Sequence, residues 1–202
     1  MKQRRLFTTL LAALLVVVSF GLAACGGHAS EKAVRQSLEE NFSSIKFGGA
    51  DGDFAKEFEK NIDDSFGPYG IDSAEFTKSY MEGFDYKIGD ITVDEQNGKA
   101  VAQVSITVKP MMELVESVYH RLMVEAMSLP DDATEDDLNA LTGKLIMEGI
   151  ASLEPKATDV EITYNRASNG DWEPDLESVE TAFATAAMGD ADPETVRALT
   201  GA

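Results

Sequence analysis

Two Asn-Gly pairs constrain the fold of this 202-residue chain most, because each marks a tight turn between two antiparallel strands. The first pair, Asn97-Gly98, precedes a run whose apolar members alternate with mostly polar residues: Ala100, Ala102, Val104, Ile106 and Val108. The second pair, Asn169-Gly170, follows a similar alternation over residues 160–164. Because a period of two is typical of half-buried strands, the sequence predicts two β-hairpins. In the first hairpin, the apolar positions of the leading strand shift by one residue between Ile88 and Ile91.

Helical patterns precede the first hairpin. Ser30 is placed to cap a helix that begins at Glu31 and ends at the glycines 48–49. A second helix is expected to begin at Asp51 or Asp53. A third is expected after Asp72, whose spacing to residue 75 resembles a capping box.

Two more helices are predicted between the hairpins and one after them. Pro110 and Thr134 precede helical patterns that form a pair over residues 111–153, and Asp175 caps the last main helix. On the first helix of the pair, apolar residues run at helical spacing: Met111, Leu114, Val115, Val118 and Leu122. On the second, the expected buried face consists of Leu138, Leu141, Leu145 and Ile150. A short helix is expected in the tail, residues 190–202.

The predicted fold class is α+β. The order of elements favours an antiparallel sheet of about four strands, helices packed on one face, and a helical pair inserted between the two hairpins. The domain is expected to span residues 31–189. Pro174 limits the last strand to an edge or a short stub, because proline has no backbone N–H for the ladder.

The first 25 residues indicate export. Three cations (Lys2, Arg4, Arg5) precede a charge-free apolar stretch, which ends in Leu22-Ala23-Ala24-Cys25. This ending resembles the lipobox of bacterial lipoproteins. The resemblance implies cleavage before Cys25, a diacylglyceryl thioether on its sulfur and a fatty acid such as palmitate on its amine.

Two alternatives remain for this segment: an uncleaved transmembrane helix, barely long enough for about 30 Å of hydrocarbon, and a plain secretory signal. As a lipoprotein, the domain would be anchored to the cell membrane and face away from the cytoplasm. Residues 25–30 are then expected to be a short flexible linker that reaches only about 17 Å.

The charge excludes some partners. The chain has 36 acidic and 17 basic residues, a formal net charge of −19, and the first 24 residues contain cations and no acid. We therefore expect no nucleic-acid partner, since cationic contacts with phosphate supply most of that affinity. An anionic lipid surface would also repel the domain.

No cofactor, metal site or catalytic group is predicted. One cysteine and two histidines do not build a typical zinc site. His120 follows Glu116 by one helical turn but lies beside the apolar stripe, and no nucleophile accompanies it. The acidic residues at 131–137 lack the spacing of a calcium loop, so we interpret them as helix-capping and solvated residues.

From residue 30 to 189 the chain is similar to the cone-shaped domains of the nuclear-transport-factor-2-like (cystatin-like) superfamily. The likeness rests on the leading helices, the strand at 99–108 and the ending Asn169-Gly170-Asp171-Trp172-Glu173-Pro174-Asp175. The inserted helical pair and Pro174 depart from the usual pattern. The resemblance implies an apolar pocket between sheet and helices, with a filled core as the alternative. The candidate ligand-binding side chains are Phe76, Tyr80, Phe84, Tyr86, Tyr164 and Trp172.

These observations favour a non-enzymatic binding module for a small ligand, a peptide or an envelope protein partner. One alternative is an enzyme that uses the cone-shaped pocket. Another is a structural or assembly factor of the envelope, which predicts an exposed apolar patch on the helical pair at 111–153.

Overall fold

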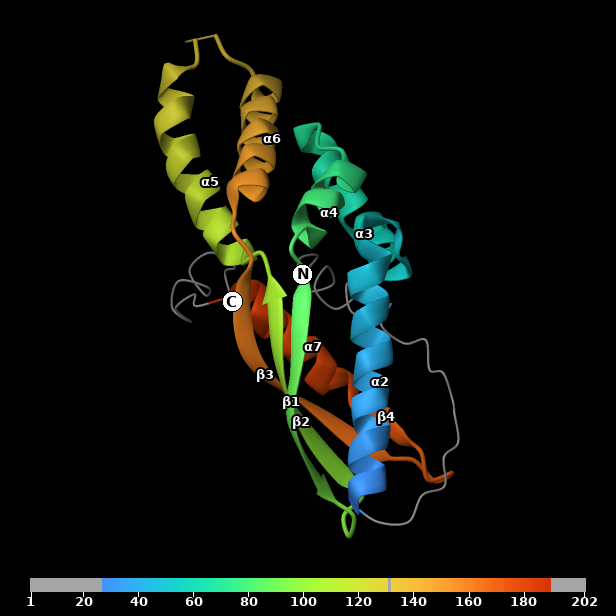
Figure 1. Cartoon of the computed structure of the whole chain (residues 1–202). Coiled ribbons are helices and arrows are strands. Elements are labelled where there is room, and N and C mark those ends of the chain that lie inside the picture. Colours follow the sequence, from blue (N-terminus) through green and yellow to red (C-terminus); the bar gives the residue numbers. More distant parts are fainter. Residues whose placement is uncertain (1–26, 131, 190–202) are drawn as a thin grey trace.

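The computed structural model describes residues 27–130 and 132–189, which form one four-stranded antiparallel sheet and the helices around it (Figure 1). The strands follow the order β1-β2-β3-β4. They span Asp85–Asp94, Lys99–Val108, Lys156–Arg166 and Trp172–Pro174. The predicted α+β class is confirmed, and so is the helical pair between the two hairpins.

Register within the sheet follows the two turns. β2 and β3 pair along their whole length, from Lys99 opposite Asn165 to Val108 opposite Lys156. Gly98 in the first turn has a φ of +61°, which glycine adopts without steric cost. β4 has only three residues, as Pro174 predicts.

A β-bulge interrupts β1. Ile88 lies opposite Val104 and Ile91 opposite Ala102, so β1 contains one residue more than β2 over this interval. The shift in the apolar pattern is therefore confirmed. Arg35 supports the bulge from the neighbouring helix, because its guanidinium donates to the carbonyl oxygen of Gly89 at 2.9 Å.

Two helices cover one face of the sheet. α2 (Gly27–Gly48) packs on β1, and α7 (Leu176–Met188) packs on β3. The rings of Phe42 and Phe183 stack with centroids 5.7 Å apart, so the two helices meet over the same face. The opposite face is polar, with Gln103 donating to Glu161 across the strands at 2.8 Å.

The beginning of α2 differs from the prediction. The helix begins at Gly27 rather than at Glu31, so part of the expected linker at 25–30 is helical. Ser30 is buried inside the helix and does not cap it. The reason is that Ser30 lies four residues before Val34 and extends the buried stripe by one turn.

The upper half of the molecule consists of helices (Figure 1). α3 (Asp53–Phe66) and α4 (Ser73–Met81) are joined by the short 3₁₀ helix η3 (Gly67–Tyr69), and η2 (Gly49–Asp51) precedes α3. The predicted cap of α4 is confirmed, since the Asp72 carboxylate accepts from the backbone N–H of Glu75 at 2.9 Å.

A helical hairpin completes the upper half. It consists of α5 (Met111–Glu125), the 3₁₀ helix η4 (Ala126–Ser128) and α6 (Glu135–Ser152). Thr134 forms a capping box with Asp137 at the beginning of α6. Within the described ranges, no helix has the length and apolarity that a membrane crossing requires.

Candidate functional site

The six aromatic residues predicted to line a pocket lie in different parts of the fold. Phe76 and Tyr80 stack on each other at 6.5 Å between ring centroids, and both stack on Phe58 of α3. These rings belong to the helical upper half. Phe84 lies just before β1 and is buried.

The sheet separates the other three aromatic residues. Tyr86 lies opposite Ile106, and Tyr164 lies opposite Ala100. Six positions along β2 correspond to about 20 Å, so the two tyrosines are at opposite ends of the buried face. Trp172 pairs with Arg166 beyond that end, and the guanidinium carbon lies 6.0 Å from the ring centroid. The predicted convergence of all six is therefore wrong, because the strand register places them apart.

Four of the six side chains pack as core. Phe76, Tyr80, Phe84 and Tyr164 are each at most 8% exposed. Burial raises the pKa of Tyr80 to about 12, and burial likewise raises the pKa of Tyr164 to about 12. Both phenols thus remain neutral at physiological pH.

The helical hairpin supplies a different candidate surface. α6 is its inner helix, because it packs on α4 and η3. Gly143 of α6 lies against the carbonyl oxygen of Tyr69, where a Cβ atom would collide. Gly149 admits Leu114 of α5, whose Cδ1 would be 2.5 Å from a Cβ at that position. α5 therefore packs on α6 with one side and forms the outer edge of the hairpin (Figure 1).

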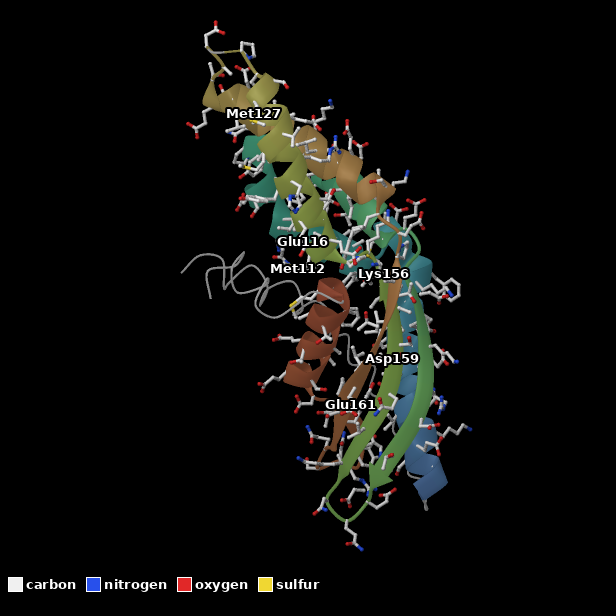
Figure 2. All side chains as sticks on the ribbon, turned by 90° about the vertical axis from the view of Figure 1, so that its left-hand side faces the viewer. Met112, Glu116, Met127, Lys156, Asp159 and Glu161 are labelled. Atoms are coloured by element: carbon white, nitrogen blue, oxygen red, sulfur yellow. The ribbon has the colours of Figure 1, made fainter. Side chains whose placement is uncertain are left out.

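The other side of α5 presents apolar side chains to solvent. Val115, Tyr119, Met123 and Met127 recur every four residues, with exposed fractions of 41%, 54%, 59% and 79%. We call these four residues the outer stripe. Figure 2 views the hairpin from the side of α5, with Met112 and Glu116 near the base of α5 and Met127 of η4 near the tip of the hairpin.

Val124 and Leu138 are also exposed near the hairpin tip. The prediction that Leu138 lies on the buried face of its helix is wrong, whereas Leu145 and Ile150 are buried as predicted. Within the apolar row of α5, Leu114 is buried and Val115 is exposed. The physical reason is that each helix of the pair has only one neighbour near the tip. The signal for the outer stripe was present in the sequence as a second row of apolar residues with a spacing of four.

The distal half of the hairpin contributes little to the core, which it touches through the partly buried Val118. Asp131 aside, no residue from 115 to 142 is buried. If a partner covered the outer side of this pair, apolar side chains would leave water, and that transfer is favourable.

Both cationic side chains of the hairpin form ion pairs. The Arg121 guanidinium donates to Glu148 at 2.7 Å and to Glu125 at 3.0 Å. Glu148 and Glu125 hold the pKa of Arg121 above its usual range. Lys144 also pairs with Glu148, at 3.7 Å. Arg121 therefore links α5 to α6, whereas Lys144 pairs within α6.

A buried lysine joins the hairpin to the sheet. Lys109, the residue between β2 and Pro110, donates from Nζ to the carbonyl oxygen of Ile150 at 2.9 Å. Its side chain is 3% exposed, and Glu82 lies 3.6 Å away. Because this bond satisfies a carbonyl at the C-terminal end of α6, it fixes where the hairpin leaves the body.

His120 is exposed on α5 next to the outer stripe, with its ring 6.0 Å from that of Tyr119. Within residues 27–130 and 132–189, no group of three or more His, Cys, Asp or Glu side chains is arranged to hold a metal ion. Cys25, the predicted lipidation site, lies outside the described residues, and so does the tail at 190–202.

Comparisons with known proteins give a distant likeness to a solved structure. No protein-family model and no curated protein matches the chain. Among solved structures, the chain is similar to ycdA of Bacillus subtilis subsp. subtilis str. 168, a protein provisionally described as a lipoprotein. The identity is 13%, the TM-score is 0.43, and the match covers 77% of this chain and 54% of that one. The chain thus spans about half the length of that protein, and the likeness is too distant to assign a family.

Proposed function

We propose that this protein is a lipoprotein, anchored to the outer side of the cell membrane through Cys25, that binds an envelope protein partner through the outer stripe. The observation that supports this proposal is the row of exposed apolar side chains on the distal part of the hairpin, where none of the described residues from 115 to 142 is buried. Contiguous apolar surface of this kind is typical of protein interaction sites.

The chemistry of the stripe favours a protein over a small ligand. Tyr and Met are enriched in protein–protein interfaces, and the stripe contains one tyrosine and two methionines. A small ligand, in contrast, requires a concave site that encloses most of its surface. The outer stripe lies on the convex side of a single helix.

The geometry of the chain places the stripe away from the proposed anchor. Only Gly26 separates Cys25 from the first residue of α2. α2 begins at the end of the sheet where the two hairpin turns lie, opposite the helical half (Figure 1). A lipidated Cys25 would therefore leave the outer stripe pointing away from the bilayer.

We infer that the body is a variant of the domain found in the nuclear-transport-factor-2-like superfamily. Support comes from the leading helices and from the four-stranded antiparallel sheet with helices on one face. In this variant, aromatic rings of α2 and α7 occupy the space above the sheet, as Phe42 stacks on both Tyr86 and Phe183.

Photo-crosslinking in intact cells tests the binding proposal. A photoreactive phenylalanine analogue replaces Tyr119 in one strain and Phe47 in another. Phe47 is 83% exposed on α2 and serves as the matched control. We expect a discrete crosslinked adduct from position 119 only. Adducts from neither position, or equally from both, would contradict the proposal.

A separate labelling experiment tests the anchor. Cells are fed a clickable fatty acid, and the wild-type chain is compared with Cys25→Ala. We expect label on the wild type alone. Equal labelling of the two chains would remove the anchor from the proposal without affecting the crosslinking result.

A further inference from the structure

Given the proposed function of the outer stripe, we propose that the partner's docking segment is an amphipathic helix with lysine or arginine beside its apolar face. The proposal combines the shape of the stripe, the charge around it and the area that it offers.

The shape of the stripe fits a helix. Its members are four residues apart, so those in α5 form one ridge that is inclined by about 26° to the helix axis, and Met127 of η4 follows at its end. Ridges of this spacing pack into the grooves of another helix at an interaxial distance of about 8–10 Å. Helices that dock in this way use apolar anchors three or four residues apart.

The charge around the stripe requires a cationic partner. Residues 111–153 contain nine Asp and Glu against two cations, Arg121 and Lys144. Both cations are already in ion pairs within the hairpin. Glu116 lies beside the stripe near its base, and the exposed Asp132 and Glu135 lie near its tip. Lysine or arginine at the edges of a partner helix would pair with these acids, whereas acidic residues there would be repelled.

The same charge and the available area argue against a second copy of this chain. Two hairpins of this composition would bring like charges together. A 15-residue helix is also only about 22 Å long and about 10 Å wide. One such face falls well short of the roughly 800 Å² per partner that a stable interface buries, which argues against a stable symmetric dimer. A single partner helix docked on the same face is expected to form a weak, transient contact.

Binding of a designed helical peptide tests the inference. The protein used spans residues 25–202 and carries Cys25→Ala so that it is purified without detergent. The probe is a fluorescent peptide of three Lys-Leu-Lys-Lys-Leu-Leu-Lys heptads, and its twin has glutamate at every lysine. We expect the lysine peptide to bind at least about tenfold more tightly than the glutamate twin, as measured by fluorescence anisotropy.

Two protein variants distinguish the stripe from general acidity. The double variant Tyr119→Ser and Met123→Ser removes the centre of the stripe, and Phe47→Ser removes a still more exposed ring elsewhere. We expect the double variant to weaken binding of the lysine peptide by about tenfold or more, and Phe47→Ser to leave it unchanged. All three side chains are exposed, so circular dichroism and the urea midpoint should match those of the parent chain.

Equal binding of the two peptides, or equal binding by the two variants, would overturn the inference. The crosslinking experiment remains independent of this outcome. An adduct at position 119 in cells, together with peptides that bind alike, would leave the protein partner in place and exclude a cationic helix as its docking segment.

Discussion

At the scale of single residues, Gly143 determines how closely the hairpin approaches the body. A Cβ atom at this position would collide with the backbone carbonyl of Tyr69, and backbone cannot rotate away as a side chain can. We expect Gly143→Ala to lower the free energy of unfolding by about 1–3 kcal/mol, which is the usual range for overpacking. Urea denaturation would measure the change.

Gly48 provides the matched control for that substitution. It lies at the end of α2 with a helical φ of −66°, and nothing lies within 4 Å of a Cβ there. Gly48→Ala should therefore be neutral or stabilise by about 0.4–1 kcal/mol. If both substitutions gave the same change, the close approach at Gly143 would have no energetic consequence.

Tyr80 makes stability depend on alkaline pH. Its pKa is raised by burial to about 12, above the ordinary value of 10.0 that the unfolded chain has. A folded pKa above the unfolded one gives stability that is complete below pH 10 and is lost as the pH rises through about 12. We expect Tyr80→Phe to remove part of this loss, about 1–3 kcal/mol between pH 8 and pH 12.

Urea midpoints at pH 8 and pH 11 would show this effect as a smaller drop in Tyr80→Phe than in the wild type. Tyr119→Phe is the control, because its ring is exposed and outside the core. Drops of equal size in the wild type and in Tyr80→Phe would contradict the burial of an un-ionised phenol at this position.

At the scale of elements, α6 divides into two parts. From Gly143 onward it packs on the body, with Leu145 and Ile150 fully buried, whereas residues 135–142 contain no buried side chain. Amides with little burial around them open at low free-energy cost. We therefore expect hydrogen exchange in residues 135–142 to be much faster than in residues 143–151, as measured by mass spectrometry.

Because both segments belong to the same helix, they are compared in the same secondary structure and in the same exchange experiment. Uniform protection along the whole of α6 would mean that the distal hairpin has support beyond what α5 provides. Binding of a partner to the outer stripe should slow exchange at residues 115–128 first, because that is where the contact forms.

The sequence predicted the helices and strands better than the tertiary contacts that these elements make. Strand positions and the caps at Asp72, Thr134 and Asp175 follow from local rules, because a turn or a cap depends only on residues a few positions apart. The bulge between Ile88 and Ile91 was also visible as a shift in period. These features account for the sheet and most of the helix boundaries.

The candidate site could not be predicted in the same way. Whether Val115 or Met123 faces a core depends on how many neighbours α5 has, and that number comes from tertiary packing. The periodicity of an apolar row is the same for a buried face and for an exposed one. The six aromatic residues were likewise assigned to one place because their distance along β2 was not apparent before the register was known.

At the scale of the whole molecule, the beginning of α2 and the outer stripe lie at opposite ends. Strands of ten residues extend about 33 Å, and the 18-residue α6 adds about 27 Å in the same direction (Figure 1). In membranes, we expect a fluorophore on Asn97→Cys to transfer energy strongly to acceptor lipids in the headgroup layer. The same fluorophore on Ala133→Cys should transfer little.

Each labelled chain has only the added thiol available when Cys25 is lipidated, so the labelling is specific. The same two chains with Cys25→Ala provide the control without an anchor. Equal transfer from both positions would indicate that the molecule lies on its side, with the hairpin against the bilayer.

The absence of buried side chains between residues 115 and 142, Asp131 aside, has a consequence for how this scaffold changes over generations. We expect substitutions in that stretch to leave the body folded. The amino acids there can therefore change by neutral drift or be selected for a new contact. Exchanging this stretch between two proteins built on the same body should therefore exchange what they recognise while leaving their melting temperatures nearly the same.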